Sequence, residues 1–168
     1  MSTITPLFHI TLPELDDNSP EAHFAPLVFA LEGMIAINKH HIIRAFKRAA
    51  QGLGPPVPPL YDSGVVYKED PPGREDWRDV FGILQRGVAD CDQLVSWRCA
   101  ELQVAGIAAE PVIKWQHIPR EIACALGYGA NVGADGLWMV HCCVRYPDGT
   151  IEDPSKRLGM GGNFTSQV

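Results

Sequence analysis

The sequence has no long hydrophobic run. Its longest apolar stretch without a charge covers about residues 24–31, far short of the roughly 20 residues that a membrane-spanning helix needs. Residues 1–12 lack the basic start and extended apolar segment of a secretory signal. We therefore expect no membrane partner and a cytoplasmic location, or a virion-associated one if the protein is encoded by a phage.

Positive charge is also scarce. The chain has 14 lysines and arginines against 20 aspartates and glutamates, for a formal net charge of −6. Binding to nucleic acid needs a basic surface that displaces counterions from the phosphates, so this balance argues against a nucleic-acid partner. One basic stretch occurs at residues 39–48, but such a stretch is more typical of the solvated face of a helix.

The cysteines form neither a disulfide framework nor a metal-ligand motif. Their number is odd, and the chain contains no CxxC or HxxxH pair. We therefore expect free thiols in a reducing compartment, with no metal and no cofactor. The five cysteines are Cys91, Cys99, Cys124, Cys142 and Cys143.

The length of 168 residues favours a single domain. Its first part, residues 1–75, is predicted to hold a short strand at residues 7–12 and helical structure at residues 21–51, as one helix or two. Prolines and glycines then predict a long surface arm at residues 52–75.

The second part, residues 76–155, shows the patterns of short helices and an antiparallel sheet, followed by a glycine-rich tail at residues 156–168. Together they predict an α+β fold with helices packed on the sheet. The predicted helices cover residues 74–85, 92–105 and 118–126, the predicted strands cover residues 110–115 and 138–146, and a hairpin turn at residues 147–150 leads into residues 151–153.

Three polar residues occupy positions that suit a catalytic triad. Cys91 begins a predicted helix, where backbone N–H groups and the helix dipole favour a thiolate. His141 lies in a predicted strand, and Asp153 follows the hairpin partner of that strand. Each residue alone is more typical of an ordinary structural role. Together they predict a nucleophile, a base and a carboxylate that orients the base.

The segments around these residues resemble the transglutaminase-like superfamily of papain-like cysteine enzymes. GVADCDQLVSWRCAELQVAGI at residues 87–107 is similar to its nucleophile helix, WMVHCCVRYPDG at residues 138–149 to its histidine strand, and IEDPS at residues 151–155 to its Asp-Pro motif. The resemblance spans about residues 76–155, in the order of the family. It implies a transglutaminase-like core with Cys91 as nucleophile, His141 as base and Asp153 as orienter.

The resemblance implies acyl transfer through a thioester on Cys91, by a protease, amidase or transglutaminase-type acyltransferase that acts on a protein or peptide amide. The backbone N–H of Cys91 is the first expected donor to the oxyanion. Gln85 is the candidate side-chain donor, and Trp77 is the second choice. An alternative is a non-catalytic module of the same fold, serving as a structural subunit of a larger assembly such as a phage particle.

Overall fold

The computed structural model describes residues 20–71, 76–125, 127–128, 132–134 and 136–161. The predicted strand at residues 7–12 and the last part of the tail, residues 162–168, lie outside the described residues. Within them, helices pack on small sheets, which confirms the α+β prediction. None of the described helices combines the length and apolar character needed to cross a membrane.

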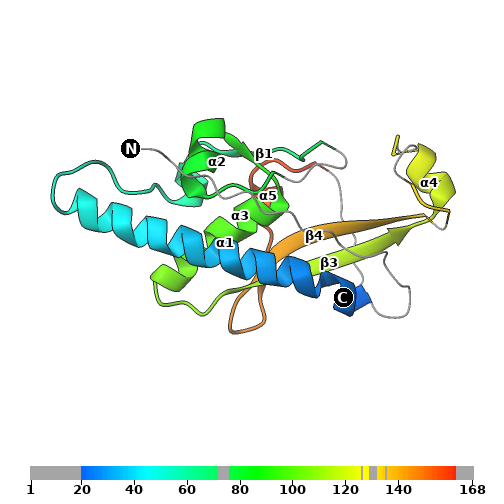
Figure 1. The fold of residues 1–168 in the computed structure, drawn as a ribbon, viewed down its shortest axis with the longest axis horizontal. Helices are drawn as coiled ribbons and strands as arrows, with labels where there is room; N and C mark the ends of the chain where they lie inside the picture. Colours follow the sequence, from blue (N-terminus) through cyan, green and yellow to red (C-terminus); the bar gives the residue numbers. More distant parts are fainter. Residues whose placement is uncertain (1–19, 72–75, 126, 129–131, 135, 162–168) are drawn as a thin grey trace.

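One long helix, α1 (Pro20–Ala49), runs across the molecule (Figure 1). The sequence left open whether this region forms one helix or two, and the structure has one, because Asn38 is buried and bonded rather than a break. Its Oδ1 accepts a hydrogen bond from the Val80 N–H at 2.8 Å, and its Nδ2 donates to Ser96 Oγ at 3.3 Å. Asn38 thereby joins α1 to two other helices.

The arm at residues 52–75 is only partly the surface segment that we predicted. It contains a short 3₁₀ helix (Leu60–Asp62) and strand β1 (Val66–Tyr67), which pairs in parallel with β2 (Val88–Ala89). Leu60 and Val65 are almost fully buried. The prediction of a draped arm fails because contacts with distant residues, which local composition does not reveal, bury these apolar side chains.

The two short helices α2 and α4 form where the sequence predicts helices, but each begins later than predicted. Helix α2 covers Val80–Arg86 and begins later than the predicted residue 74, because the Asp79 side chain caps it by accepting from the Gly82 N–H. Helix α4 (Arg120–Ala125) lies within the predicted range of residues 118–126 and begins later because Ile118 still belongs to β3.

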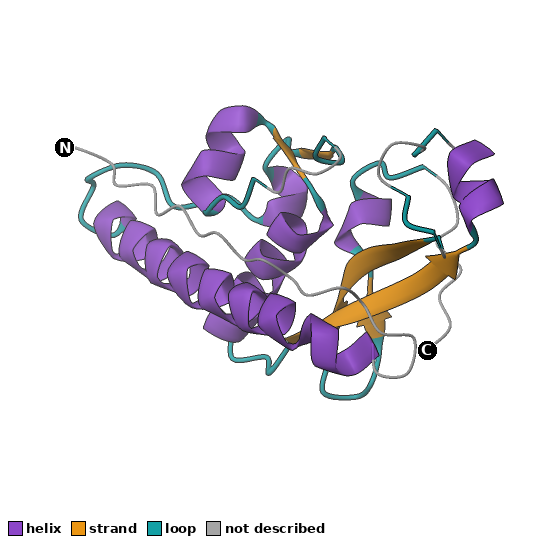
Figure 2. Ribbon diagram, turned by 45° about the vertical axis from the view of Figure 1, so that its right-hand side comes forward, coloured by secondary structure: helices purple, strands orange, loops and turns teal. Residues whose placement is uncertain are grey.

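Helix α3 (Cys91–Val104) lies at the centre, as predicted, with Gly106 in the left-handed conformation just beyond its end. It is buried on nearly every side, because α1 and the main sheet cover one side and α2 with the arm covers the other (Figure 2). The predicted inward residue Ala105 is exposed, since it falls at the C-cap. Two hydrophobic clusters therefore meet on this helix.

The main sheet is antiparallel, with strand order β3-β4-β5. Strand β3 (Glu110–Ile118) extends three residues beyond its prediction, and β4 (Leu137–Arg145) pairs along its whole length. The predicted hairpin joins β4 to β5 (Ile151–Glu152), and helix α5 (Pro154–Arg157) follows at once. This connection holds Asp153 beside β4.

Candidate active site

Cys91 is the first residue of α3 and is half-buried. The preceding residue, Asp90, is the N-cap, and its Oδ1 accepts a hydrogen bond from the Cys91 N–H at 2.6 Å. The sequence correctly placed the thiol at a helix start. It did not reveal that the backbone N–H expected to bind an oxyanion is occupied by Asp90, so the expectation of a ready donor there is wrong for this structure.

His141 lies on β4 and is buried. Strand β5 pairs with Val144 and Arg145 of β4, and the chain then brings Asp153 beside His141. The imidazole Nε2 lies 3.0 Å from Oδ2 of Asp153. Oδ1 of the same carboxylate accepts from the Lys156 N–H at 3.1 Å, as the N-cap of α5. The carboxylate is thus fixed from two directions.

The Cys91 and His141 side chains also interact, and each shifts the pKa of the other. Because Nε2 faces Asp153, Nδ1 is the ring nitrogen left for the thiol. The structure therefore brings together the three residues that the sequence selected, in the order Cys91–His141–Asp153.

The protonation of this pair differs from the sequence-based expectation. Burial opposes charge on His141, but hydrogen bonds to Asp153 and Cys91 outweigh it and raise its pKa to about 9. The neighbouring Cys142 thiol and burial together hold the pKa of Cys91 well above its ordinary range, against the effect of His141. The predicted lowering of the thiol pKa is therefore wrong, because the sequence does not show that Cys142 and the core cover the helix start.

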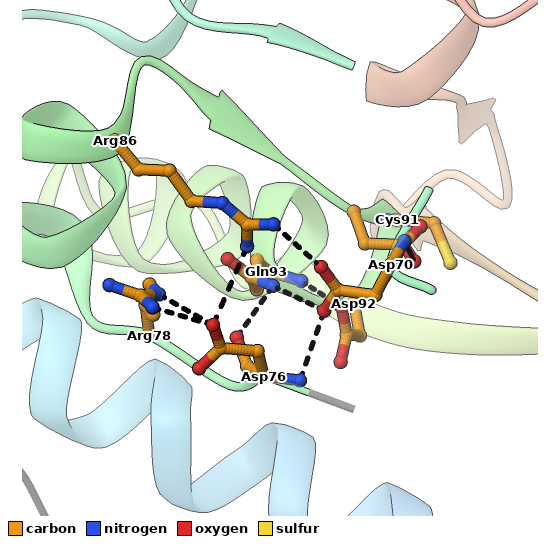
Figure 3. A network of polar contacts seen from close by, with 8 residues as sticks. Asp70, Asp76, Arg78, Arg86, Cys91, Asp92 and Gln93 are labelled. Carbon is orange, nitrogen blue, oxygen red and sulfur yellow. Dashed lines mark hydrogen bonds and ion pairs between the residues drawn. The ribbon is translucent and has the colours of Figure 1, made fainter. Parts of the chain in front are cut away.

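A network of carboxylates and cations fixes the loops around the helix start (Figure 3). Asp90 Oδ2 accepts from the Asp70 N–H at 2.9 Å, and the buried Asp70 carboxylate accepts from Arg86 at 3.1 Å and from Gln93 Nε2 at 3.4 Å. Gln93 also donates to the Asp76 carbonyl at 2.9 Å. The sequence analysis missed this network, since Asp70 comes from the arm and only tertiary packing brings it to α3.

Of the two predicted side-chain donors, one lies in α2 and the other in the loop that precedes it. Gln85 lies in the last turn of α2 and is exposed. Trp77 is half-buried and packs against the same hydrophobic cluster as Cys91. A third group, Tyr67 on β1, was missed: its hydroxyl bonds the Asp90 side chain, and burial together with the charges of Asp90 and Cys91 raises its pKa, so it stays protonated.

Comparison of the chain with protein-family models, with curated proteins and with solved structures gave no match in any of the three searches. The assignment of chemistry therefore rests on this site.

Glu152, the residue before Asp153, is held in place by a second group of polar contacts. Its carboxylate accepts from the hydroxyls of Tyr61 and Tyr146 and from Arg98 Nε at 3.0 Å. The hydrogen bonds from both tyrosines and Arg98 hold the pKa of Glu152 below its usual value despite partial burial. These contacts join the arm, α3 and β5 where the chain leaves the sheet toward Asp153.

One group of side chains offers potential metal ligands, although the sequence contains no CxxC or HxxxH pair. One ligand atom from each of His141, Cys143 and Asp153 lies within 4.8 Å of the other two. His141 and Cys143 are buried and Asp153 is half-buried. Residues 141 and 143 share one face of β4 because side chains alternate along a strand. Burial raises the pKa of Cys143 to about 11, and the Asp153 charge adds to this shift.

Proposed function

We propose that the protein is a cysteine hydrolase of transglutaminase-like type, which cleaves amide bonds through a thioester on Cys91. The observation that carries the proposal is that Cys91 interacts with His141, whose Nε2 lies 3.0 Å from the Asp153 carboxylate. A cysteine at a helix start, a histidine on a sheet strand and a carboxylate after the next strand match the order that the sequence resemblance implies.

In the proposed reaction, His141 Nδ1 takes the thiol proton as Cys91 Sγ attacks the amide carbon. The tetrahedral oxyanion collapses, the C–N bond breaks, and the leaving amine takes the proton from His141. Water, deprotonated by His141, then attacks the thioester and releases the acid. An amine in place of water would give transamidation.

The resting site must lose one proton before this cycle starts. With the pKa of His141 at about 9 and that of Cys91 raised, the imidazole is charged and the thiol neutral at pH 7. The neutral imidazole that acts as base forms as the pH rises through about 9, so turnover by this route increases over that range.

Stabilisation of the oxyanion needs donors other than the Cys91 N–H as it stands, since that group is bonded to Asp90. The Tyr67 hydroxyl bonds Asp90 and its pKa is raised by the charge of Cys91, and Trp77 packs on the same cluster as the thiol. The Tyr67 hydroxyl must leave Asp90 to take this role, as the Cys91 N–H must, and its raised pKa keeps its proton in place.

Turnover of a simple acyl ester tests the proposal without knowledge of the substrate. The full chain is mixed with p-nitrophenyl acetate at pH 9, and acetylated cysteines are located by peptide mass mapping over time. We expect an acetyl group on Cys91 that forms and is then hydrolysed. Cys91→Ala should fold normally and lose this turnover, and His141→Ala should stop the hydrolysis.

The exposed Cys124 on α4 is the internal reference, because an ordinary thiol holds its acetyl group without a neighbouring base. Acetylation of Cys124 with none on Cys91, or turnover that survives Cys91→Ala, would remove the proposal.

The alternative is a non-catalytic module of the same fold, a subunit of a larger assembly. Two observations favour it: the raised pKa of the Cys91 thiol and the occupied Cys91 N–H. An inert Cys91 in the ester experiment would make this alternative the leading one.

A further inference from the structure

The group formed by His141, Cys143 and Asp153 carries an inference beyond the proposed hydrolase. Its donors are an imidazole nitrogen, a thiol sulfur and a carboxylate oxygen, whose atoms lie within 4.8 Å of one another. Mixed donors of this kind suit a borderline-soft divalent ion such as Zn²⁺ rather than Mg²⁺ or Ca²⁺, which prefer oxygen ligands. No other group of three or more such residues is found among the described residues.

The dimensions fit a tetrahedral centre after a small contraction. Zinc–ligand bonds of about 2.0–2.3 Å place neighbouring ligand atoms roughly 3.3–3.7 Å apart. The present spread of up to 4.8 Å needs side-chain rotations that close about 1 Å. Three protein ligands leave a fourth position for water, which is the arrangement of an open zinc site.

We propose that His141, Cys143 and Asp153 form a binding site for Zn²⁺ that competes with the use of His141 as a base. On binding, His141 Nε2, a thiolate on Cys143 and a carboxylate oxygen of Asp153 each form a bond to the ion. The Cys143 thiol proton and the proton held between His141 and Asp153 pass to solvent. The Nε2–Oδ2 hydrogen bond that orients His141 is replaced by metal bonds.

The metal site stands without the proposed activity, and only its inhibitory effect rests on that activity. Binding is therefore measured directly. The metal-free full chain is titrated with Zn²⁺ in competition with a chromophoric zinc chelator, and in parallel with Co²⁺, whose thiolate complexes have a charge-transfer absorption band.

We expect one zinc ion per chain. Cys143→Ser and Asp153→Asn should each weaken binding by about tenfold or more, since even groups outside the ligand set change affinity by about 10–100-fold. The cobalt charge-transfer band should disappear in Cys143→Ser. Cys124→Ser, which changes an exposed cysteine on α4, is the matched control and should bind like the original chain, and Mg²⁺ should not compete.

If Cys143→Ser and Cys124→Ser bind Zn²⁺ with equal affinity, the proposed site is wrong. It is also wrong if Cys91→Ser weakens Zn²⁺ binding while Cys143→Ser does not. Circular dichroism of each variant shows that it is folded, and Asp153→Asn gives a second test should Cys143→Ser not fold. If zinc binds through Cys143 but no ester turnover is found at any pH, the metal site is supported and the hydrolase proposal is wrong. If turnover is found but zinc does not bind, the hydrolase proposal is supported and the metal site is wrong.

Discussion

The Asp153 carboxylate lies 3.0 Å from Nε2 of His141, at the point where the chain leaves β5 and enters α5. The hairpin that carries Asp153 is short, so the carboxylate and the imidazole reach each other from adjacent segments of one sheet. Because His141 is buried, this contact is shielded from water, and it is the main attraction that raises the pKa of the imidazole.

Replacement of Asp153 by Asn should lower the pKa of His141 from about 9 toward its ordinary value of 6.5. The amide keeps the size of the side chain but removes the negative charge. NMR titration of the His141 Cε1 proton measures the change. Asp62→Asn, at an exposed position of the 3₁₀ helix, is the control, and an unchanged His141 titration in Asp153→Asn would show that another group stabilises the imidazolium.

The stability of the protein should fall as the pH rises from about 6.5 to about 9. His141 has a raised pKa in the folded state, so its stabilising contribution is complete below the unfolded value of 6.5 and is lost as the pH passes about 9. The contribution is at most about 3 kcal/mol. Urea denaturation at several pH values measures it.

His141→Gln should flatten this pH dependence, and His40→Gln, on the exposed face of α1, should preserve it. If the stability of His141→Gln still falls with pH as steeply as that of the original protein, groups other than His141 cause the pH dependence.

Iodoacetamide should label Cys91 with a pH midpoint above that of the exposed Cys124, because Cys142 and burial raise the Cys91 pKa. Cys142→Ala should move the Cys91 midpoint to lower pH. Cys99→Ala changes another buried cysteine of the same cluster and serves as the control. Peptide mapping follows all cysteines at once, and rapid labelling of Cys91 below pH 7 would contradict the raised pKa.

Asn38→Ala should lower the free energy of unfolding by about 1–3 kcal/mol, because the buried Val80 N–H loses its acceptor. Ser96→Ala leaves the Val80 N–H bonded and removes the 3.3 Å contact with Asn38 and a 2.9 Å bond from Ser96 Oγ to the Gln93 carbonyl, and it should cost less. The midpoints of urea denaturation compare the two variants. A larger loss in Ser96→Ala would place the important contact on α3 rather than on α2.

Glu152→Ala should destabilise the protein by about 2 kcal/mol, because Arg98 and two tyrosine hydroxyls lose a shared acceptor. Thermal denaturation measures the loss. Glu110→Ala removes a carboxylate whose ion pair with Arg145 is exposed and should change stability by less than about 1 kcal/mol. Equal losses in the two variants would show that burial adds nothing to the Glu152 network.

The sequence determined the elements whose signals are local. Periodicity and a terminal glycine define α3, alternation defines β4, and a Pro-Asp-Gly turn defines the hairpin. Cys91, His141 and Asp153 were found because each stands at a marked position of such an element: a helix start, a strand, and the end of a hairpin.

Only the tertiary structure decided the environment of that site. Local composition made residues 52–71 look like a surface arm, yet contacts with distant segments bury Leu60 and bring Asp70 to the start of α3. The same holds for the Cys91 thiol: a helix start lowers a thiol pKa through local dipoles, but burial and the neighbouring Cys142 raise it. The sequence shows which groups are near one another along the chain, whereas pKa values and access depend on which distant groups exclude water from them.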